Sequence, residues 1–263
     1  MKIAFIGCGN MATAIINGIT KKGKVKKENI FIADTDKEKL DKLASQGFNT
    51  STDNQVAVDN AKYIFLTIKP QHYQMVLQSL HNVCGKIFIS VAPAISIAKI
   101  ENWAGAVAIR TMPNTPALIG HGVTAMCKGD NVGKEDFTNI VNLFESFSDV
   151  HQLDESQMDV AIALSGSSPV IAYMLTECMS KFATSYGVDL GKAKCMVAKT
   201  LIGAGEMILQ SGDTPEILTQ RVCSKGGTTE QMVASLRENN FEQIIQKSMA
   251  ACIDRAVKMN NLF

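Results

Sequence analysis

The amino-terminal residues include a glycine-rich segment with the spacing of a phosphate-binding loop. Gly7, Gly9 and Ala12 follow the apolar run IAFI and open an amphipathic stretch. At this spacing the first glycine permits a tight turn, and the second lets the main chain approach a pyrophosphate. The small third residue lets helix and strand pack closely. The segment, with Asn10 and Met11, therefore predicts dinucleotide binding; a glycine-tolerant turn in another α/β fold is the alternative.

A carboxylate follows the second predicted strand. Asp34 lies about 20 residues beyond the glycine motif, where an acidic residue commonly accepts a hydrogen bond from the adenosine ribose 2′-hydroxyl. This position favours NADH as the cofactor. Lys37 and Lys39 could supply charge for the 2′-phosphate of NADPH, and Asp36 could instead cap the next helix. The sequence therefore leaves both NADH and NADPH open.

Two further polar segments coincide with the ends of predicted strands. Thr67, Lys69 and Pro70 lie in one of them, and Asn114 lies in the other, within the segment MPNT. In doubly wound sheets, ligands bind beyond the carboxyl ends of the strands. We therefore expect these four residues to bind the cofactor on its nicotinamide side, although prolines at such places also simply end strands.

The composition excludes several kinds of partner. A total of 26 Lys and Arg against 25 Asp and Glu gives a formal net charge of +1, which supplies no basic field for nucleic acid or an anionic membrane. Seven scattered cysteines without a Cys-x-x-Cys pair, and four histidines without ligand spacing, predict neither disulfides nor a metal site. The amino-terminal apolar run is too short for a signal sequence or a membrane span. We expect a cytoplasmic protein that binds a small molecule.

In the first half of the chain, short apolar strands alternate with amphipathic helical stretches. This order predicts right-handed crossovers and an α/β fold with a doubly wound, mostly parallel sheet. The predicted strands are 2–6, 30–33, 63–68, 86–91, 106–110 and 122–126, and the predicted helices are 11–22, 36–46 and the segment after Gln71.

After about Asp154 the pattern becomes helical throughout. The periodicity predicts helices over 158–186, 190–211, 229–239 and 241–260. We place a domain boundary here, with a dinucleotide-binding domain at 1–155 and an all-helical domain at 156–263. These helices carry more apolar surface than a domain of this size can bury, so we expect a homodimer that shares them. An ordinary helical core is the alternative.

Five segments in chain order resemble the pyrroline-5-carboxylate reductases: IGCGNMATAI, LTIKP, RTMPNTPAL, LSGSSP and VCSKGGTT. The resemblance covers essentially the whole chain. It implies a Rossmann domain followed by a helical domain for dimerisation and substrate binding, with dimers that can form a decameric ring. It also implies reduction of the cyclic imine 1-pyrroline-5-carboxylate to L-proline by NADPH or NADH.

The same resemblance implies a site. The glycine segment corresponds to the family's phosphate loop, and Lys69, Pro70 and Asn114 to contacts on the nicotinamide side. A second loop would hold the substrate carboxylate through backbone amides and hydroxyls; its residues are Ser224, Gly226, Gly227, Thr228 and Thr229. A Gly-Gly turn leading into a helix aims free N–H groups at an anion, although it also serves as a plain helix start. Thr229 is the candidate catalytic residue, polarising the ring nitrogen or relaying a proton through water.

Several residues depart from the family pattern. Lys225 stands where proline is usual, Val170 and Ile171 stand where Ala-Tyr is usual, and Arg237 and Asn240 replace glutamate and glycine. These changes bear on substrate choice and turnover more than on the fold. They favour, as one alternative, a non-catalytic dinucleotide-binding paralogue.

The other alternative is a β-hydroxyacid dehydrogenase with the same two-domain plan. Alcohol oxidation needs a base, typically a lysine in the first long helix of the second domain. From Ser165 onward no lysine occurs until Lys181. The sequence therefore favours imine reduction.

Overall fold

The computed structural model describes residues 1–262, which form two compact units. The first unit holds Met1–Ser167 and the end of the chain from Cys252, and the second holds Ser168–Ala251. The boundary between the units follows Ser167, whereas the sequence pattern placed it after residue 155. The two differ because residues 156–167 pack on the sheet of the first unit.

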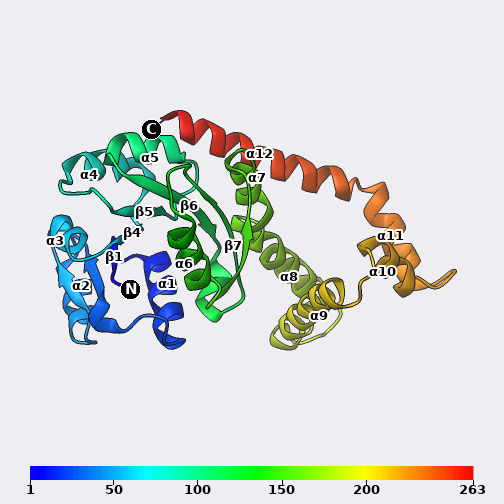
Figure 1. Ribbon diagram of the computed structural model, residues 1–263. Coiled ribbons are helices and arrows are strands. Elements are labelled where there is room, and N and C mark those ends of the chain that lie inside the picture. The colour runs from blue at the N-terminus through cyan, green and yellow to red at the C-terminus, as the bar shows by residue number, and fades with distance from the viewer. Residues whose placement is uncertain (263) are drawn as a thin grey trace. The chain divides into compact units, whose positions relative to one another are not determined.

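The first unit is built on one eight-stranded sheet (Figure 1). Its order is β3-β2-β1-β4-β5-β6-β7-β8, and every neighbouring pair is parallel except β6 and β7. The strands are β1 (Ile3–Ile6), β2 (Ile30–Ala33), β3 (Asn49–Ser51), β4 (Tyr63–Leu66), β5 (Ile87–Ser90), β6 (Val107–Pro113), β7 (Gly122–Lys128) and β8 (Ser148–Gln152). The prediction of a doubly wound, mostly parallel sheet is confirmed.

Helices cover both faces of this sheet. They are α1 (Asn10–Lys21), α2 (Lys37–Ala44), α3 (Asn54–Asp59), α4 (Tyr73–Ser79), α5 (Ile97–Ala104), α6 (Lys134–Phe144) and α7 (Met158–Ala161). Residues of α1 and α6 pack against one face, and those of α3, α4 and α5 against the other. Because side chains alternate along a strand, Phe5 of β1 joins the first core and Ile6 joins the second. The rings of Phe5 and Phe65 stack at 4.8 Å.

Two strands at the edges of the sheet were not predicted from the sequence. β3 (NTS) and β8 (SDVHQ) are polar and largely unburied, so they lack the apolar run by which a strand is recognised. The six predicted strands are all present, with ends shifted by up to three residues.

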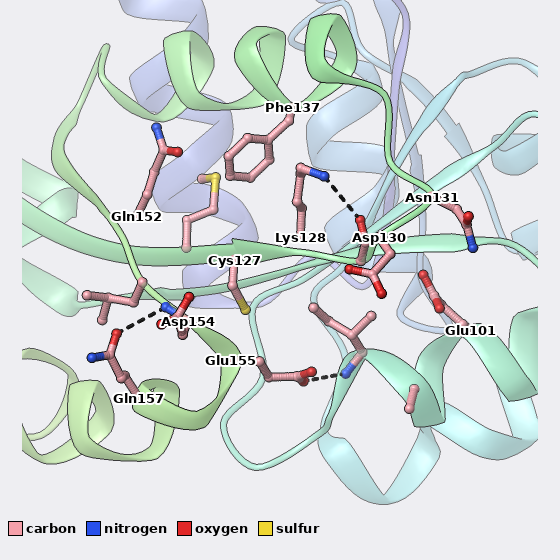
Figure 2. Close-up of a pocket in the computed structure, with 15 residues that line it drawn as sticks. Glu101, Cys127, Lys128, Asp130, Asn131, Phe137, Gln152, Asp154, Glu155 and Gln157 are labelled. Carbon is pink, nitrogen blue, oxygen red and sulfur yellow. Dashed lines mark hydrogen bonds between the residues drawn. The ribbon is translucent and has the colours of Figure 1, made fainter.

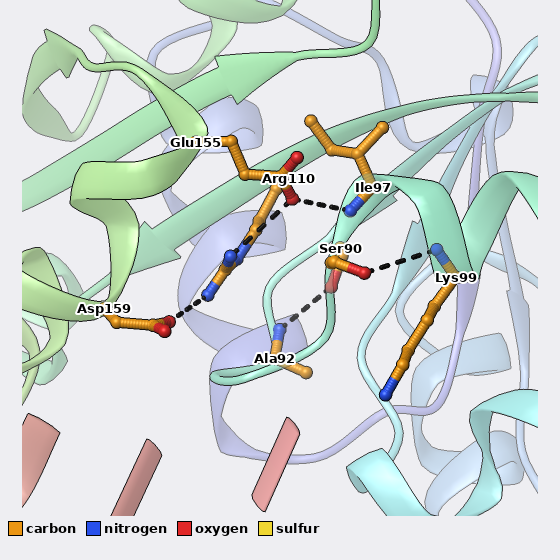
Figure 3. Close-up of polar contacts among 8 residues, drawn as sticks. Ser90, Ala92, Ile97, Lys99, Arg110, Glu155 and Asp159 are labelled. Carbon is orange, nitrogen blue, oxygen red and sulfur yellow. Dashed lines mark hydrogen bonds and ion pairs between the residues drawn. The ribbon is translucent and has the colours of Figure 1, made fainter. Parts of the chain in front are cut away.

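A buried arginine holds the start of the helical region on the sheet (Figure 3). Arg110 of β6 is 5% exposed, and its guanidinium lies 2.7 Å from the Asp159 carboxylate and 3.7 Å from that of Glu155. Glu155 also accepts a 2.7 Å hydrogen bond from the Ile97 N–H at the start of α5. Glu155 and Asp159 remain partly exposed, but removing either carboxylate would leave the buried guanidinium charge with less compensation. This cluster therefore fixes the segment that follows β8.

The second unit consists of helices: α8 (Pro169–Thr184), α9 (Leu190–Gln210), α10 (Pro215–Val222), α11 (Thr228–Glu238) and the first part of α12 (Phe241–Leu262). The prediction of helices is confirmed, but α10 lies between the predicted helices 190–211 and 229–239, where no helix was expected. Its start has helix signals, since the Thr214 hydroxyl accepts from the Ile217 N–H and Pro215 occupies the first turn.

These helices expose much apolar surface. Tyr173, Met174 and Phe182 of α8 are each more than 60% exposed, and Leu209 of α9 is 83% exposed. Within residues 1–262, one helical stretch, Glu155–Thr184, also meets the length and composition of a membrane span. Its first turns carry Glu155 and Asp159, which pair with Arg110 on the sheet. Exposed apolar faces of this extent are typical of surfaces that another protein covers.

We predict that Gly18→Ala destabilises the protein although alanine favours helices. A Cβ at position 18 of α1 would lie 2.6 Å from Cβ of Phe147. We expect overpacking to lower the free energy of unfolding by about 1–3 kcal/mol, which outweighs the gain of about 1 kcal/mol in helix propensity. Chemical denaturation measures the change. Phe147→Ala removes Cγ and Cδ1, which would lie 2.6 and 2.7 Å from the added Cβ, and should reduce the loss in the double variant. Additive losses would contradict the clash.

Candidate functional site

The glycine turn after β1 is held by main-chain bonds to its two neighbouring strands. The Gly7 N–H donates to the Ala33 carbonyl at 2.7 Å, and its φ of +98° lies in the region that favours glycine. A Cβ at this position would lie 2.9 Å from the carbonyl carbon and oxygen of Thr67. Only glycine therefore fits where β1, β2 and β4 end together.

The amino end of α1 faces open space. Gly9 caps the helix without a side-chain hydrogen bond, and a Cβ there would meet nothing within 4 Å. Asn10 is exposed, Met11 is half-buried, and Ala12 is fully buried against the strands. The first N–H groups of a helix carry partial positive charge and have no partner within the helix. This end of α1 has the form of a site for the phosphates of a dinucleotide.

Asp34 is bonded to the glycine turn. Its carboxylate accepts from the Cys8 N–H at 2.7 Å and from the Asp36 N–H at 3.0 Å. Partial burial acts to raise the pKa of Asp34, but the N–H groups of Asp36 and Cys8 outweigh it and hold the pKa below its usual value. Asp34 is therefore ionised at neutral pH. Its charge lies at the end of β2, where it suits a ribose hydroxyl better than a phosphate.

Two charged residues beside Asp34, Asp36 and Lys39, form a pair. Lys39 lies 2.9 Å from the Asp36 carboxylate, which lowers the pKa of Asp36 and raises that of Lys39. Asp36 also caps α2 by accepting from the Lys39 N–H. Lys37, at the first position of α2, is exposed.

The segment after β4 supports the glycine turn. The Thr67 hydroxyl donates to the carbonyls of Gly7, at 2.7 Å, and Ile6, at 3.0 Å. Lys69 is exposed, and Pro70 starts a short 3₁₀ turn. Thr67 is therefore engaged with the phosphate loop, while the Lys69 ammonium is accessible from solvent.

Asn114 is buried and engaged on both sides. Its side-chain N–H₂ donates to the Ser165 carbonyl at 3.1 Å, and its oxygen accepts from the Val123 N–H at 2.9 Å. The residue is 6% exposed. The sequence pattern placed Asn114 on the nicotinamide side, and in the structure its amide joins β6, β7 and the turn that precedes α8.

The predicted substrate loop lies in the second unit, at the start of α11. Gly226 has a φ of +72°, and the Gly227 N–H donates to the Ser224 carbonyl at 2.8 Å. A Cβ on Gly227 would collide with the Ser224 side chain. Thr228 is exposed and Thr229 is half-buried in the first turn. The glycines thus form a tight turn that leads directly into a helix amino end.

Glu230 is a site residue that our sequence analysis missed. Its carboxylate accepts from the Gly226 N–H at 2.6 Å. A glutamate at the third helical position commonly reaches back to the N–H of the capping residue. Here the cap is Gly227 and Glu230 bonds one residue earlier, but that spacing was the available signal. One N–H group of the expected anion site is therefore already bonded to a carboxylate of the chain itself.

A cavity of about 710 Å³ lies beside the end of β7, where Cys127 and Lys128 help to line it (Figure 2). It includes Lys128, which pairs with Ile109 near the start of β6. Acidic side chains surround it, among them Glu101, Asp130 and Asp154. Within residues 1–262, no group of three or more His, Cys, Asp or Glu side chains is placed to hold a metal ion.

Comparison with known proteins identifies similar chains over the full length. One family model, pyrroline-5-carboxylate reductase dimerisation, matches residues 155–259, and another, NADP oxidoreductase coenzyme F420-dependent, matches residues 2–94. The pyrroline-5-carboxylate reductase of Escherichia coli (strain K12) is 31% identical over 98% of both chains. The corresponding protein of Pasteurella multocida (strain Pm70) is 34% identical over 99% of this chain and 98% of its own.

A solved structure gives the same result in three dimensions. The crystal structure of Plasmodium falciparum pyrroline carboxylate reductase with NADP bound superposes with a TM-score of 0.90 at 27% identity. The superposition covers 99% of this chain and 98% of that one. The likeness therefore extends through both the sheet and the helices.

We predict that Cys8 resists alkylation at pH 8 in the folded protein. Burial, with the hydrogen bond to Asp34, raises the pKa of the Cys8 thiol to about 12, so little of the reactive thiolate is present. The exposed Cys84 is the internal control. Peptide mass spectrometry after iodoacetamide treatment should find Cys84 modified and Cys8 intact. Labelling of both at similar rates would contradict the burial of the Cys8 thiol.

Proposed function

This chain belongs to the pyrroline-5-carboxylate reductase family, and we propose that it reduces 1-pyrroline-5-carboxylate to L-proline with NADPH or NADH. The observation that carries the proposal is the full-length match to these reductases, through the sheet unit and the helical unit alike. The resemblance of the five sequence segments is thus confirmed at the level of the family.

The cofactor fits the carboxyl edge of the sheet. The open amino end of α1, formed by Gly9, Asn10 and Met11, would hold the pyrophosphate, with Gly7 and Ala12 allowing the close approach of loop and helix. Asp34 would accept from the adenosine ribose, while Lys69 and Pro70 would border the nicotinamide side. When bound, the dihydronicotinamide supplies a hydride.

The substrate loop would hold the other reactant. The N–H groups at the start of α11 and the hydroxyls of Ser224, Thr228 and Thr229 suit a carboxylate. Glu230 must share or release the Gly226 N–H when that carboxylate arrives. Orienting a protonated imine in this way lowers the entropic barrier to reaction, and the Thr229 hydroxyl would polarise the ring nitrogen or relay a proton.

We propose that the chain is cytoplasmic and forms a homodimer, and the helical unit supports the homodimer. The apolar side chains of α8 and α9 are exposed in the single chain, and residues 155–259 match the family's dimerisation model. We propose that a second copy covers them, that dimers can assemble further into a decameric ring, and that 156–263 acts as the dimerisation and substrate-binding domain. We propose no membrane or nucleic-acid partner.

The first test follows the absorbance of NADH and NADPH with pyrroline-5-carboxylate. We expect turnover with both cofactors and a higher kcat/KM for NADH, because ionised Asp34 disfavours a 2′-phosphate. Asp34→Ser should shift the ratio toward NADPH by about tenfold, equivalent to about 1.4 kcal/mol. Asp36→Ser, which removes a nearby charge but keeps a helix cap, is the control. Cofactor binding without turnover would instead identify a non-catalytic paralogue.

The second test addresses Thr229. We expect Thr229→Ala to lower kcat by about 100-fold if its hydroxyl takes part in proton transfer, while the Kd for NADPH changes little. Thr219→Ala is the matched control, since the Thr219 hydroxyl bonds to the Pro215 carbonyl of its own helix α10. An unchanged kcat in the Thr229 variant would remove this residue from the mechanism.

A further inference from the structure

The helix that leaves the sheet contains a π turn. After α7, residues Ile162–Gly166 form a π-helical segment, and the Ser167 N–H donates to the Ile162 carbonyl five residues earlier at 2.7 Å. In an α-helix the Ser165 carbonyl would accept from the N–H of residue 169, but that residue is Pro169, which has no N–H. The turn therefore needs a donor from elsewhere.

Asn114 supplies that donor. Its side-chain nitrogen bonds to the Ser165 carbonyl at 3.1 Å while its oxygen accepts from the Val123 N–H at 2.9 Å. The bond joins residues 51 positions apart in the chain. An alanine at position 114 would leave two main-chain groups without this partner, and unpaired buried groups are costly.

A second contact fits the turn to the same strand. Gly166 packs so closely on Met112 of β6 that a Cβ at position 166 would collide with the Met112 methyl group. Met112 lies two residues before Asn114. The strand end thus holds the π turn by a hydrogen bond and by close packing.

The turn lies at the carboxyl end of β6, the edge at which ligands bind in sheets of this type. Ser165 and Gly166 are half-buried there, and Ser167 is exposed. π turns inside helices occur often at functional sites. We propose that Asn114 is a positioning residue: it keeps this turn in the π form that hydride transfer requires, instead of contacting the reactants with its own amide. The proposal rests on the reductase activity proposed above.

A double-mutant cycle between Asn114 and Pro169 tests it. Asn114→Ala should lower the Tm by several degrees and kcat by about 10- to 100-fold, since small misplacements at a reaction centre have effects of that size. Pro169→Ala restores an N–H that can bond to the Ser165 carbonyl in an α-helical turn. In the Asn114→Ala background we expect Pro169→Ala to lower the Tm less than it does in the wild type, or to raise it. The kcat should stay low in the double variant, because the turn is now α-helical.

Asn49→Ala is the matched control, because the Asn49 amide also donates to main-chain carbonyls, those of Glu28 and Ile30. It should lower the Tm without a tenfold loss of kcat. Three results would overturn the proposal. These are recovery of kcat together with the Tm in the double variant, absence of coupling between the two positions, and an Asn114→Ala variant that changes only the KM for the cofactor, as a direct contact would.

Failure of the proposed function is separable from these outcomes. A wild-type protein without activity on pyrroline-5-carboxylate would reject the reductase reaction, and the positioning role in it would fall as well. The Tm values of the double-mutant cycle would then still report whether Asn114 and Pro169 are coupled through the Ser165 carbonyl. Only an active wild type with an altered kcat pattern supports the positioning role.

Discussion

The Gly7 turn joins three strands at the point where the predicted cofactor site begins. Its N–H bonds to the end of β2, and its carbonyl accepts from the Thr67 hydroxyl after β4. Glycine has no side chain, so the main chain at position 7 can pass close to Thr67. This close turn lets α1 begin directly above the strand ends with its amino end open. The place of Asp34 follows from the same turn, since its carboxylate bonds to the next N–H along the chain, that of Cys8.

The two units differ in how completely they bury their apolar residues within one chain. In the sheet unit, strands such as β1 and β4 are buried on both faces, so its core is complete within one chain. In the helical unit, α8 buries only Ser180 completely, and apolar residues such as Tyr173, Met174 and Phe182 are exposed. In the proposed homodimer a second copy would complete this core, and the folding of the second unit would then depend on protein concentration.

The sequence predicted those features that arise from local pattern. Ile30–Ala33 and the run IAFI are apolar strands whatever their neighbours, and the family follows from short segments such as RTMPNTPAL. The edge strand β8 could not be predicted, because its polar residues become a strand only through pairing with β7. The pairing of Asn114 with Ser165 was equally hidden, since it joins distant segments and depends on a helix with an irregular turn. Glu230 was within reach, because its spacing from Gly227 is a known capping pattern.

The buried charge of Arg110 also links two parts of the first unit that are distant in the sequence. An arginine stays protonated in proteins, so its burial in β6 depends on opposite charges nearby. Those charges come from Glu155 and Asp159, the latter 49 residues later in the chain. Separating the segment beyond β8 from the sheet would leave the guanidinium of β6 uncompensated. The ion pairs therefore favour loss of the two parts together over loss of either one alone.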